Sequence, residues 1–179
     1  MSKRLRDVAD VHYGKRQNTV VDDDGMYPIF GTGGILGMAR VPLFRGPGII
    51  VGRKGTLNNP IYVNNDFWVV DTAYAVLPKK DVHVRWLYYI LRNARLEELN
   101  EATGVPSLNR DRLYEIHVPG ISFEEQIRIA YVLDKMNDSI QKSEAVVTKK
   151  RQIFEGMIYD FLSGDKSVPD DLLPKECNA

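Results

Sequence analysis

The chain has 179 residues, of which 44% are hydrophobic and 27% are charged, a balance that favours a folded domain over a disordered chain. Its 24 basic and 24 acidic side chains cancel, which argues against a wholly basic nucleic-acid coat protein and against a polyacidic tail. The single cysteine, Cys177, excludes an internal disulfide and a cysteine-based zinc site, and the charged N-terminal segment predicts neither a signal peptide nor a membrane span, so we expect a cytoplasmic protein.

The charge is unevenly distributed along the chain. Residues 1–121 carry 16 basic and 13 acidic side chains, whereas residues 122–179 carry 8 and 11. No carboxylate occurs between Asp24 and Asp66, a stretch that holds four basic residues and nine of the 14 glycines. Such a stretch is expected where a surface meets an anionic partner or where the chain is largely buried. Both interpretations stay open at this point.

The first part of the chain has the pattern of short strands separated by turns. Runs of β-branched and aromatic residues predict strands at 27–30, 48–51, 61–63, 67–70 and 73–77. Glycines lie between these runs, where turns need positive φ angles or close backbone approach. We therefore expect a loop-rich, twisted β-sheet.

Helical elements follow the predicted sheet. Between residues 81 and 99 apolar side chains recur at helical spacing, at Leu87, Ile90, Leu91 and Ala94. We expect Asp81 to cap this helix and the helix to end near Leu99. Gly104 and Pro106 predict a return to loop over residues 100–112, and residues 114–118 are expected to form the last strand. Residues 1–121 are therefore predicted to be one α+β domain, a sheet with packed helices.

The C-terminal part predicts one long helix, residues 122–163, followed by a tail over residues 164–179. Ser122 and Glu125 form the Ser-x-x-Glu pattern of a capping box. At 1.5 Å per residue the helix is about 60 Å long. Eight of ten heptad seam positions are apolar: Ile129, Leu133, Met136, Ile140, Val147, Phe154, Met157 and Phe161. The seam favours a coiled coil with a partner helix, although Ser143 and Lys150 interrupt it; the alternative is a helix folded back onto its own domain.

No motif in the sequence predicts a catalytic site. Residues 31–37 lack the G-x-G-x-x-G spacing, and Lys54 precedes Gly55, the reverse of a P-loop. No nucleophile elbow or nucleophile–base pair is recognisable. Asp22 to Asp24 are typical of a solvated turn, because consecutive carboxylates point in different directions. A small metal-dependent hydrolase or nuclease that uses these carboxylates with Lys54 is the alternative from the enzyme class.

Recognition chemistry remains, and it favours DNA as the partner. Arginine can contact guanine or phosphate, asparagine can contact adenine, and backbone N–H groups freed by glycine turns can contact phosphates. The candidate side chains lie in the carboxylate-free stretch and in the loop 103–110. They are Thr32, Arg40, Arg45, Arg53, Lys54, Thr56, Asn58, Asn59, Ser107, Asn109 and Arg110.

Several segments together resemble one half of a specificity subunit of type I restriction-modification systems, with one target recognition domain and one spacer helix. The matching segments are 5–11 with 14–15, 27–35, 50–56, 104–110, and 118–119 followed by 124–130. A proline followed closely by Glu-Gln-x-x-Ile-Ala, at residues 125–130, is the most specific of them.

The resemblance implies a non-catalytic subunit that reads double-stranded DNA and docks adenine methyltransferase subunits. It also implies that S-adenosylmethionine and ATP bind to the methyltransferase and restriction subunits, and that this chain holds no cofactor. The full subunit of that family has two domains and two helices. Two copies of this chain, paired antiparallel through the helix, would restore both and would read an interrupted palindrome. The alternative is a truncated interaction protein that modulates such an assembly through its helix without reading DNA.

Overall fold

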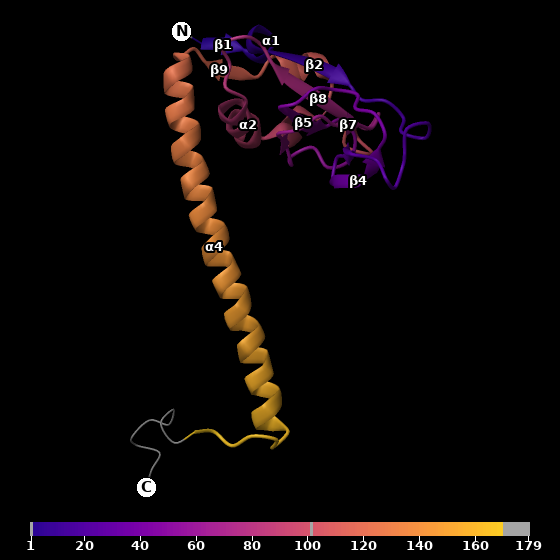
Figure 1. Cartoon of the computed structure of the whole chain (residues 1–179). Coiled ribbons are helices and arrows are strands. Elements are labelled where there is room, and N and C mark those ends of the chain that lie inside the picture. Colours follow the sequence, from indigo (N-terminus) through magenta and orange to yellow (C-terminus); the bar gives the residue numbers. More distant parts are fainter. Residues whose placement is uncertain (1, 101, 170–179) are drawn as a thin grey trace. The chain divides into compact units, whose positions relative to one another are not determined.

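The computed structural model describes residues 2–100 and 102–169 and divides into two compact units, residues 1–131 and 132–179. The strands of the described residues all lie in the first unit, together with the short helices (Figure 1). The second unit contains most of the C-terminal helix α4 (Phe123–Leu162). Cys177 and most of the predicted tail lie outside the described residues.

A four-stranded sheet forms the centre of the first unit. Its order is β2 (Ala9–Tyr13), β8 (Ala73–Pro78), β5 (Gly48–Gly52) and β6 (Ile61–Val63), and all neighbours are antiparallel. All five residues of β5 are buried, as expected for a continuous apolar run that is covered on both faces. Burial of β5 therefore explains part of the carboxylate-free stretch.

Two smaller sheets complete the strands. β3 (Tyr27–Gly31) pairs antiparallel with β4 (Gly34–Ala39) and parallel with β7 (Trp68–Val69). β1 (Ser2–Arg4) pairs antiparallel with β9 (His117–Pro119), which brings distant parts of the first unit together. The sequence did not predict β4, because its glycines are also typical of turns.

The larger core lies between the four-stranded sheet and the short helices. These are α1 (Leu5–Val8), α2 (Val84–Asn93), the 3-10 helix η1 (Leu96–Leu99) and α3 (Arg110–Tyr114). Leu87 and Leu91, one turn apart on α2, are fully buried, and burial of each side chain contributes about 1.5–3 kcal/mol. α2 lies beside β5 and β8 in Figure 1 and contacts both.

The helix predicted over residues 81–99 starts later and ends earlier than expected. His83, not Asp81, is the N-cap of α2, and its ring accepts a hydrogen bond from the backbone N of Trp86 at 3.4 Å. Asp81 has φ 63°, outside the extended conformation that an N-cap adopts. Arg95, with φ 45°, is left-handed and separates α2 from η1. The spacing of apolar residues locates a buried helix face but does not reveal these backbone changes.

The prediction of loop over residues 100–112 was also partly wrong. The side chain of Asn109 accepts a hydrogen bond from the backbone N of Asp111 at 2.9 Å and starts α3 at Arg110. Because α3 continues to Tyr114, the last strand is β9 at residues 117–119 rather than 114–118.

The first turns of α4 pack into the first unit. Ser122 Oγ accepts a hydrogen bond from the backbone N of Glu125 at 3.2 Å, which confirms the predicted N-cap. Gln126, only 5% exposed, accepts a hydrogen bond from the backbone N of His83 at 2.8 Å. Ala130 is buried, and Ile129 packs against the larger core. The start of α4 is therefore fixed by side chains of the first unit.

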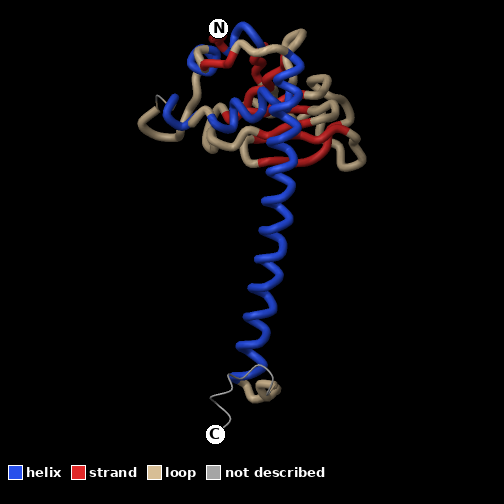
Figure 2. The backbone as a smooth tube through the Cα atoms, turned by 90° about the vertical axis from the view of Figure 1, so that its left-hand side faces the viewer, coloured by secondary structure: helices blue, strands red, loops and turns tan. Residues whose placement is uncertain are grey.

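The helix α4 has 40 residues, and Figure 2 shows it without interruption. Together with the mixed sheets and packed helices, it confirms the predicted α+β class with one long C-terminal helix. Among the described residues, no helix has both the length and the apolar composition needed to cross a membrane.

The close approach at the end of β5 gives a stability prediction. A Cβ atom on residue 52 would overlap the backbone carbonyl oxygen of Thr56, so we expect Gly52→Ala to lower the free energy of unfolding by about 2–4 kcal/mol. Urea unfolding measures this change. Gly37→Ala in β4 is the matched control, because open space surrounds its position, and it should change stability by less than about 1 kcal/mol. Equal stability of the two variants would contradict the close approach.

Candidate nucleic-acid interface

The candidate interface lies where three strands of the central sheet end together. Tyr13, the last residue of β2, faces Tyr74 near the start of β8, and Gly52 at the end of β5 pairs with Ala73. The chain then leaves β5 at Arg53, whose backbone N donates a hydrogen bond to the carbonyl oxygen of Thr72 at 2.9 Å. The sheet thus holds the loop after β5 against the start of β8.

Two loops that are distant in the sequence pair at this end of the sheet. Gly55 N donates a hydrogen bond to the carbonyl oxygen of Pro106 at 2.9 Å, and Leu108 N donates one to the carbonyl oxygen of Arg53 at 2.9 Å. Between these two hydrogen bonds, the backbones of Lys54 and Ser107 lie opposite each other as an isolated antiparallel β-bridge. The predicted residues Arg53, Lys54, Ser107, Asn109 and Arg110 therefore come together, with Thr56 next along the same loop.

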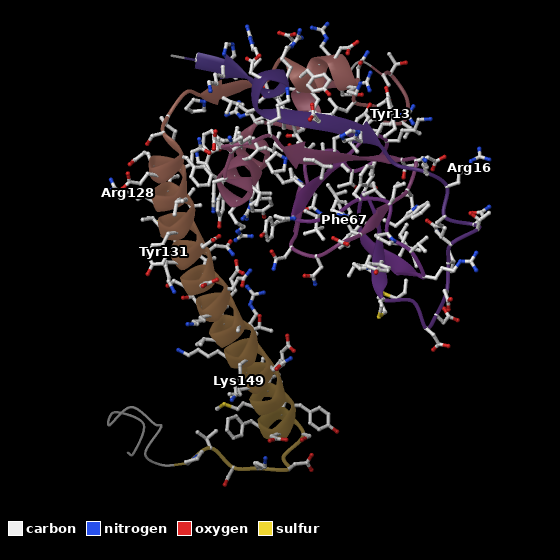
Figure 3. The ribbon with its side chains drawn as sticks, turned by 45° about the horizontal axis from the view of Figure 1, so that its top comes forward. Tyr13, Arg16, Phe67, Arg128, Tyr131 and Lys149 are labelled. Atoms are coloured by element: carbon white, nitrogen blue, oxygen red, sulfur yellow. The ribbon has the colours of Figure 1, made fainter. Side chains whose placement is uncertain are left out.

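The aromatic ring of Tyr13 is the centre of this side-chain cluster. The guanidinium carbon of Arg53 lies 5.2 Å from the centre of the Tyr13 ring, and that of Arg110 lies 5.0 Å from it. The ring of Tyr74 lies 5.2 Å away. Figure 3 labels Tyr13 and, farther along the chain, Arg16. The sequence did not point to Tyr13, because it lies before the carboxylate-free stretch and belongs to no recognisable motif.

A polar recess of about 390 Å³ opens beside Tyr13. It is lined by Tyr13, Arg53, Tyr74, Ala102, Ser107, Leu108 and Asn109. Arg53 donates a hydrogen bond through Nη1 to the carbonyl oxygen of Asp71 at 2.9 Å, while the Asp71 carboxylate pairs with Arg16 at 3.5 Å. Among the described residues, no carboxylate forms an ion pair with Arg53, Lys54 or Arg110. The recess is therefore bordered by cations that are not neutralised by partners within the described chain.

Asp71 also borders a second recess of about 370 Å³. Its other lining residues are Arg16, Gln17, Asn18, Leu36 and Val70. Leu36 lies on β4 and is 58% exposed, and the neighbouring Ile35 is 63% exposed. Polar and cationic side chains from the segment after β2 thus adjoin an exposed apolar hairpin. Sequence reasoning missed this second recess, because Arg16 to Asn18 follow no motif.

The other predicted DNA-binding residues lie apart from the Tyr13 cluster or have structural contacts. Arg40 donates a hydrogen bond to the carbonyl oxygen of Thr19 at 2.8 Å. Asn58 accepts one from the backbone N of Leu96 at 2.8 Å and so fixes the start of η1; Asn59 follows it. Thr32 lies in the turn between β3 and β4, and Arg45 lies on the loop before β5. The carboxylate-free stretch therefore does not form one continuous basic surface.

Two asparagines use their side-chain oxygens to shape the loop before α3. The Oδ1 atom of Asn109 is the cap of α3, so the part of this side chain left for a ligand is its amide nitrogen. The Oδ1 atom of Asn100 accepts hydrogen bonds from the backbone N of Ala102 at 3.1 Å and of Ser107 at 2.8 Å. Asn100 was not predicted, and its role becomes visible only when both ends of the loop are placed.

The three consecutive aspartates form a turn. Asp22 Oδ1 accepts a hydrogen bond from the backbone N of Asp24 at 3.1 Å. The described part of the chain contains no group of three His, Cys, Asp or Glu side chains arranged to hold a metal ion. The geometry around Asp22 therefore gives no support to a metal-dependent nuclease.

The predicted seam residues of α4 occupy different environments. Ile129 packs against the core of the first unit. Within the second unit, Met136, Ile140 and Val147 share one face with Ser139 and Ser143, and each of these three apolar side chains is at least half exposed. Phe154 is 63% exposed and Met157 is 37% exposed, whereas Leu133 and Phe161 are half-buried.

Comparison with known proteins identifies relatives of one kind. The family model of the type I restriction modification DNA specificity domain matches residues 1–149. The specificity subunit of the type I restriction enzyme EcoprrI from Escherichia coli is 27% identical over 129 residues, which are 72% of this chain and 32% of that protein. The specificity subunit of the type I restriction enzyme MjaIX from Methanocaldococcus jannaschii is 29% identical over 158 residues, 83% of this chain and 33% of that protein. The chain thus spans about a third of the length of these two relatives.

Solved structures show the same fold. The S subunit of a type I restriction-modification system from M. genitalium matches with a TM-score of 0.67 and 17% identity, over 93% of this chain and 46% of that chain. A chain from a structure on complex assembly and conformational transition of the type I R-M system matches with a TM-score of 0.71 and 19% identity, over 89% and 44% of the two chains. These likenesses confirm the fold.

Tyr74 gives the interface a testable pH dependence. Burial, with a smaller contribution from Tyr13, raises the pKa of Tyr74 to about 12, although the nearby Arg53 opposes the shift. Because tyrosine in the unfolded chain has a pKa of about 10, the unfolded chain loses this proton first, and stability present below pH 10 is lost as the pH rises towards 12. The Tm of the wild-type chain should therefore fall more steeply between about pH 10 and pH 12 than the Tm of Tyr74→Phe.

Tyr74→Phe also removes the hydrogen bond that the Tyr74 hydroxyl donates to the carbonyl oxygen of Leu108 at 2.9 Å. At neutral pH this variant should be less stable by about 1 kcal/mol. Parallel Tm curves for the two proteins across the alkaline range would show that Tyr74 titrates normally.

Proposed function

Because the chain belongs to the family of type I restriction modification DNA specificity domains, we propose that it reads one half of a split DNA target within a DNA-modifying assembly. Family membership confirms the prediction of a recognition subunit rather than an enzyme. One observation supports the DNA-reading part most strongly. Arg53, Lys54 and Arg110 meet at the paired loops, and no carboxylate of the described residues pairs with them.

The paired loops have the properties that a DNA-reading surface needs. Phosphates attract cations from any sequence, whereas base edges are read by hydrogen-bonding side chains held in fixed positions. The backbone bonds between the loops hold Ser107 in such a position, next to the cation Arg53. The exposed side chain of Lys54 supplies charge, and the amide nitrogen of Asn109 is a donor on the same wall. The DNA therefore contacts the ends of β2 and β5 and the start of α3.

The exposed face of α4 pairs two copies of the chain. Met136, Ile140 and Val147 recur at heptad spacing and are at least half exposed, and a single helix cannot cover its own apolar face. An antiparallel, two-fold pairing places one recognition domain on each side of the helices. Because both domains are then identical, the target is a palindrome interrupted by a spacer of fixed length.

The remaining partners follow from this role. DNA methyltransferase subunits that act on adenine dock on the paired chains and bring S-adenosylmethionine, and a separate restriction subunit brings ATP-driven cleavage. This chain itself binds neither cofactor. A chain that works on DNA in this way acts in the cytoplasm, as expected from the sequence.

Methylation mapping tests the DNA-reading role. We expect cells that express the chain with an adenine methyltransferase partner to methylate one interrupted palindrome, seen by sequencing modified bases genome-wide. Arg53→Ala with Lys54→Ala should reduce methylation of that site at least tenfold, because each lost contact to a phosphate or a base weakens binding.

Lys79→Ala with Lys80→Ala is the matched control. It also removes two positive charges, but at the opposite end of β8 from Tyr74, and it should leave methylation intact. If methylation persists in the Arg53 and Lys54 variant, the chain acts as an interaction protein that does not read DNA.

Sedimentation tests the helix pairing. We expect the wild-type chain to be a dimer at micromolar concentration and Ile140→Asp with Val147→Asp to be a monomer, because a charge cannot be buried in an apolar seam without a partner. Both side chains lie in the second unit, so the recognition domain should keep its Tm.

Ala145→Asp with Tyr159→Asp serves as the control for added charge. These residues lie on the outer face of α4 by heptad position, and the variant should remain a dimer. A monomeric wild-type chain would contradict the pairing of two copies.

A further inference from the structure

Two arginines share one aromatic ring at the candidate interface. Their guanidinium carbons lie 5.2 Å and 5.0 Å from the centre of the Tyr13 ring. Arg53 comes from the end of β5 and Arg110 from the start of α3, so the fold brings them to Tyr13 from separate parts of the chain. Cation–π attraction to one ring explains how each is positioned, but two like charges at one ring also repel each other.

No ion pair with a carboxylate of the described residues offsets that repulsion. The described lining of the recess beside Tyr13 contains no acidic residue. Asp71 borders the second recess, where its carboxylate pairs with Arg16, while its backbone carbonyl oxygen accepts a hydrogen bond from Arg53. The Nε atom of Arg110 is buried and has no hydrogen-bond partner among the described residues. The two guanidinium groups are therefore held in place without their charges being neutralised, which is the arrangement expected of a site that binds an anion.

We propose that Tyr13 is a positioning residue that carries Arg53 and Arg110 as a two-arginine clamp for the phosphodiester backbone of one DNA strand. This inference rests on the proposed function and adds the ligand class of this cluster. A phosphate group fits this site better than a guanine base. A guanine base is uncharged, and its acceptor edge binds one arginine. The site presents two guanidinium cations, which suits an anionic ligand. The clamp fixes where the strand lies, and the neighbouring Ser107 and Asn109 then face the bases.

The clamp predicts an effect that charge counting alone does not. The logarithm of the binding constant for DNA falls linearly with the logarithm of the salt concentration, and we call the steepness of this line the salt slope. Each phosphate that the protein neutralises adds about 0.9 to the salt slope. Tyr13→Leu removes no charge, yet it removes the ring that positions both arginines. Its salt slope should therefore be smaller than that of the wild-type chain by about 1–2, and its affinity at low salt should fall about tenfold or more.

The experiment measures binding of the full chain to a duplex that holds its methylated site and to the same duplex with the site scrambled, over a series of salt concentrations. Arg53→Gln and Arg110→Gln should each lower the salt slope by about 0.9, on both duplexes alike. Arg128→Gln is the control; this exposed arginine pairs with Glu124 on α4, and its loss should leave the slope unchanged. A Tm within a few degrees of the wild-type value shows that each variant is folded.

Two results would overturn the clamp. In one, Tyr13→Leu and both arginine variants keep the wild-type salt slope. In the other, the arginine variants lose affinity only for the specific duplex, and the loss depends on one base pair, which means that the arginines read a base. A wild-type chain that binds both duplexes equally contradicts the proposed sequence reading, while the salt slopes still decide whether the clamp exists.

Discussion

Backbone pairing between the loop after β5 and the loop before α3 is the constraint on which the candidate interface depends. Two hydrogen bonds, from Gly55 N to the Pro106 carbonyl and from Leu108 N to the Arg53 carbonyl, join segments that lie about fifty residues apart. Gly52 makes this possible, because its missing Cβ leaves room for the carbonyl oxygen of Thr56. Without this close approach, the two loops would not bring Arg53 and Arg110 to the same aromatic ring.

The same pairing links the core to the surface. Leu108 is buried in the larger core, and its carbonyl oxygen accepts a hydrogen bond from the hydroxyl of Tyr74. Tyr74 in turn packs against Tyr13, whose ring lies on the exposed side. The positions of Arg53 and Arg110, the arginines that we propose to contact DNA, are thus set by buried residues rather than by surface ion pairs, which contribute little to position or stability. Loops on a rigid sheet are a common place for binding residues for this reason.

Much of this organisation was predictable from local sequence patterns. The strand at residues 48–51, the cap at Ser122 and the long helix after it follow from apolar runs and capping chemistry, and the structure contains all three. The loops at Arg53 and Ser107 were both predicted to face DNA, and the structure brings them together.

Other features depend on long-range contacts that no local pattern encodes. Tyr13 is one aromatic residue at the end of a strand, and its importance arises only from arginines forty and ninety-seven positions later. Asn58 has a residue type suited to adenine, but its side chain fixes the start of η1. The carboxylate-free stretch was a useful but mixed signal, because it combines a buried strand, β5, with Arg53 and Lys54 at its end, while Arg40 contacts Thr19 elsewhere.

Hydrogen exchange of the full chain with and without its target duplex tests the central claim most directly, since it needs no substitution and reports on each loop separately. The account predicts that backbone amides of residues 52–57 and 103–110 exchange more slowly when DNA is bound, because the duplex covers both paired loops. Unchanged exchange in both segments, with slowing confined to α4, would contradict a DNA-reading surface at the ends of β2 and β5.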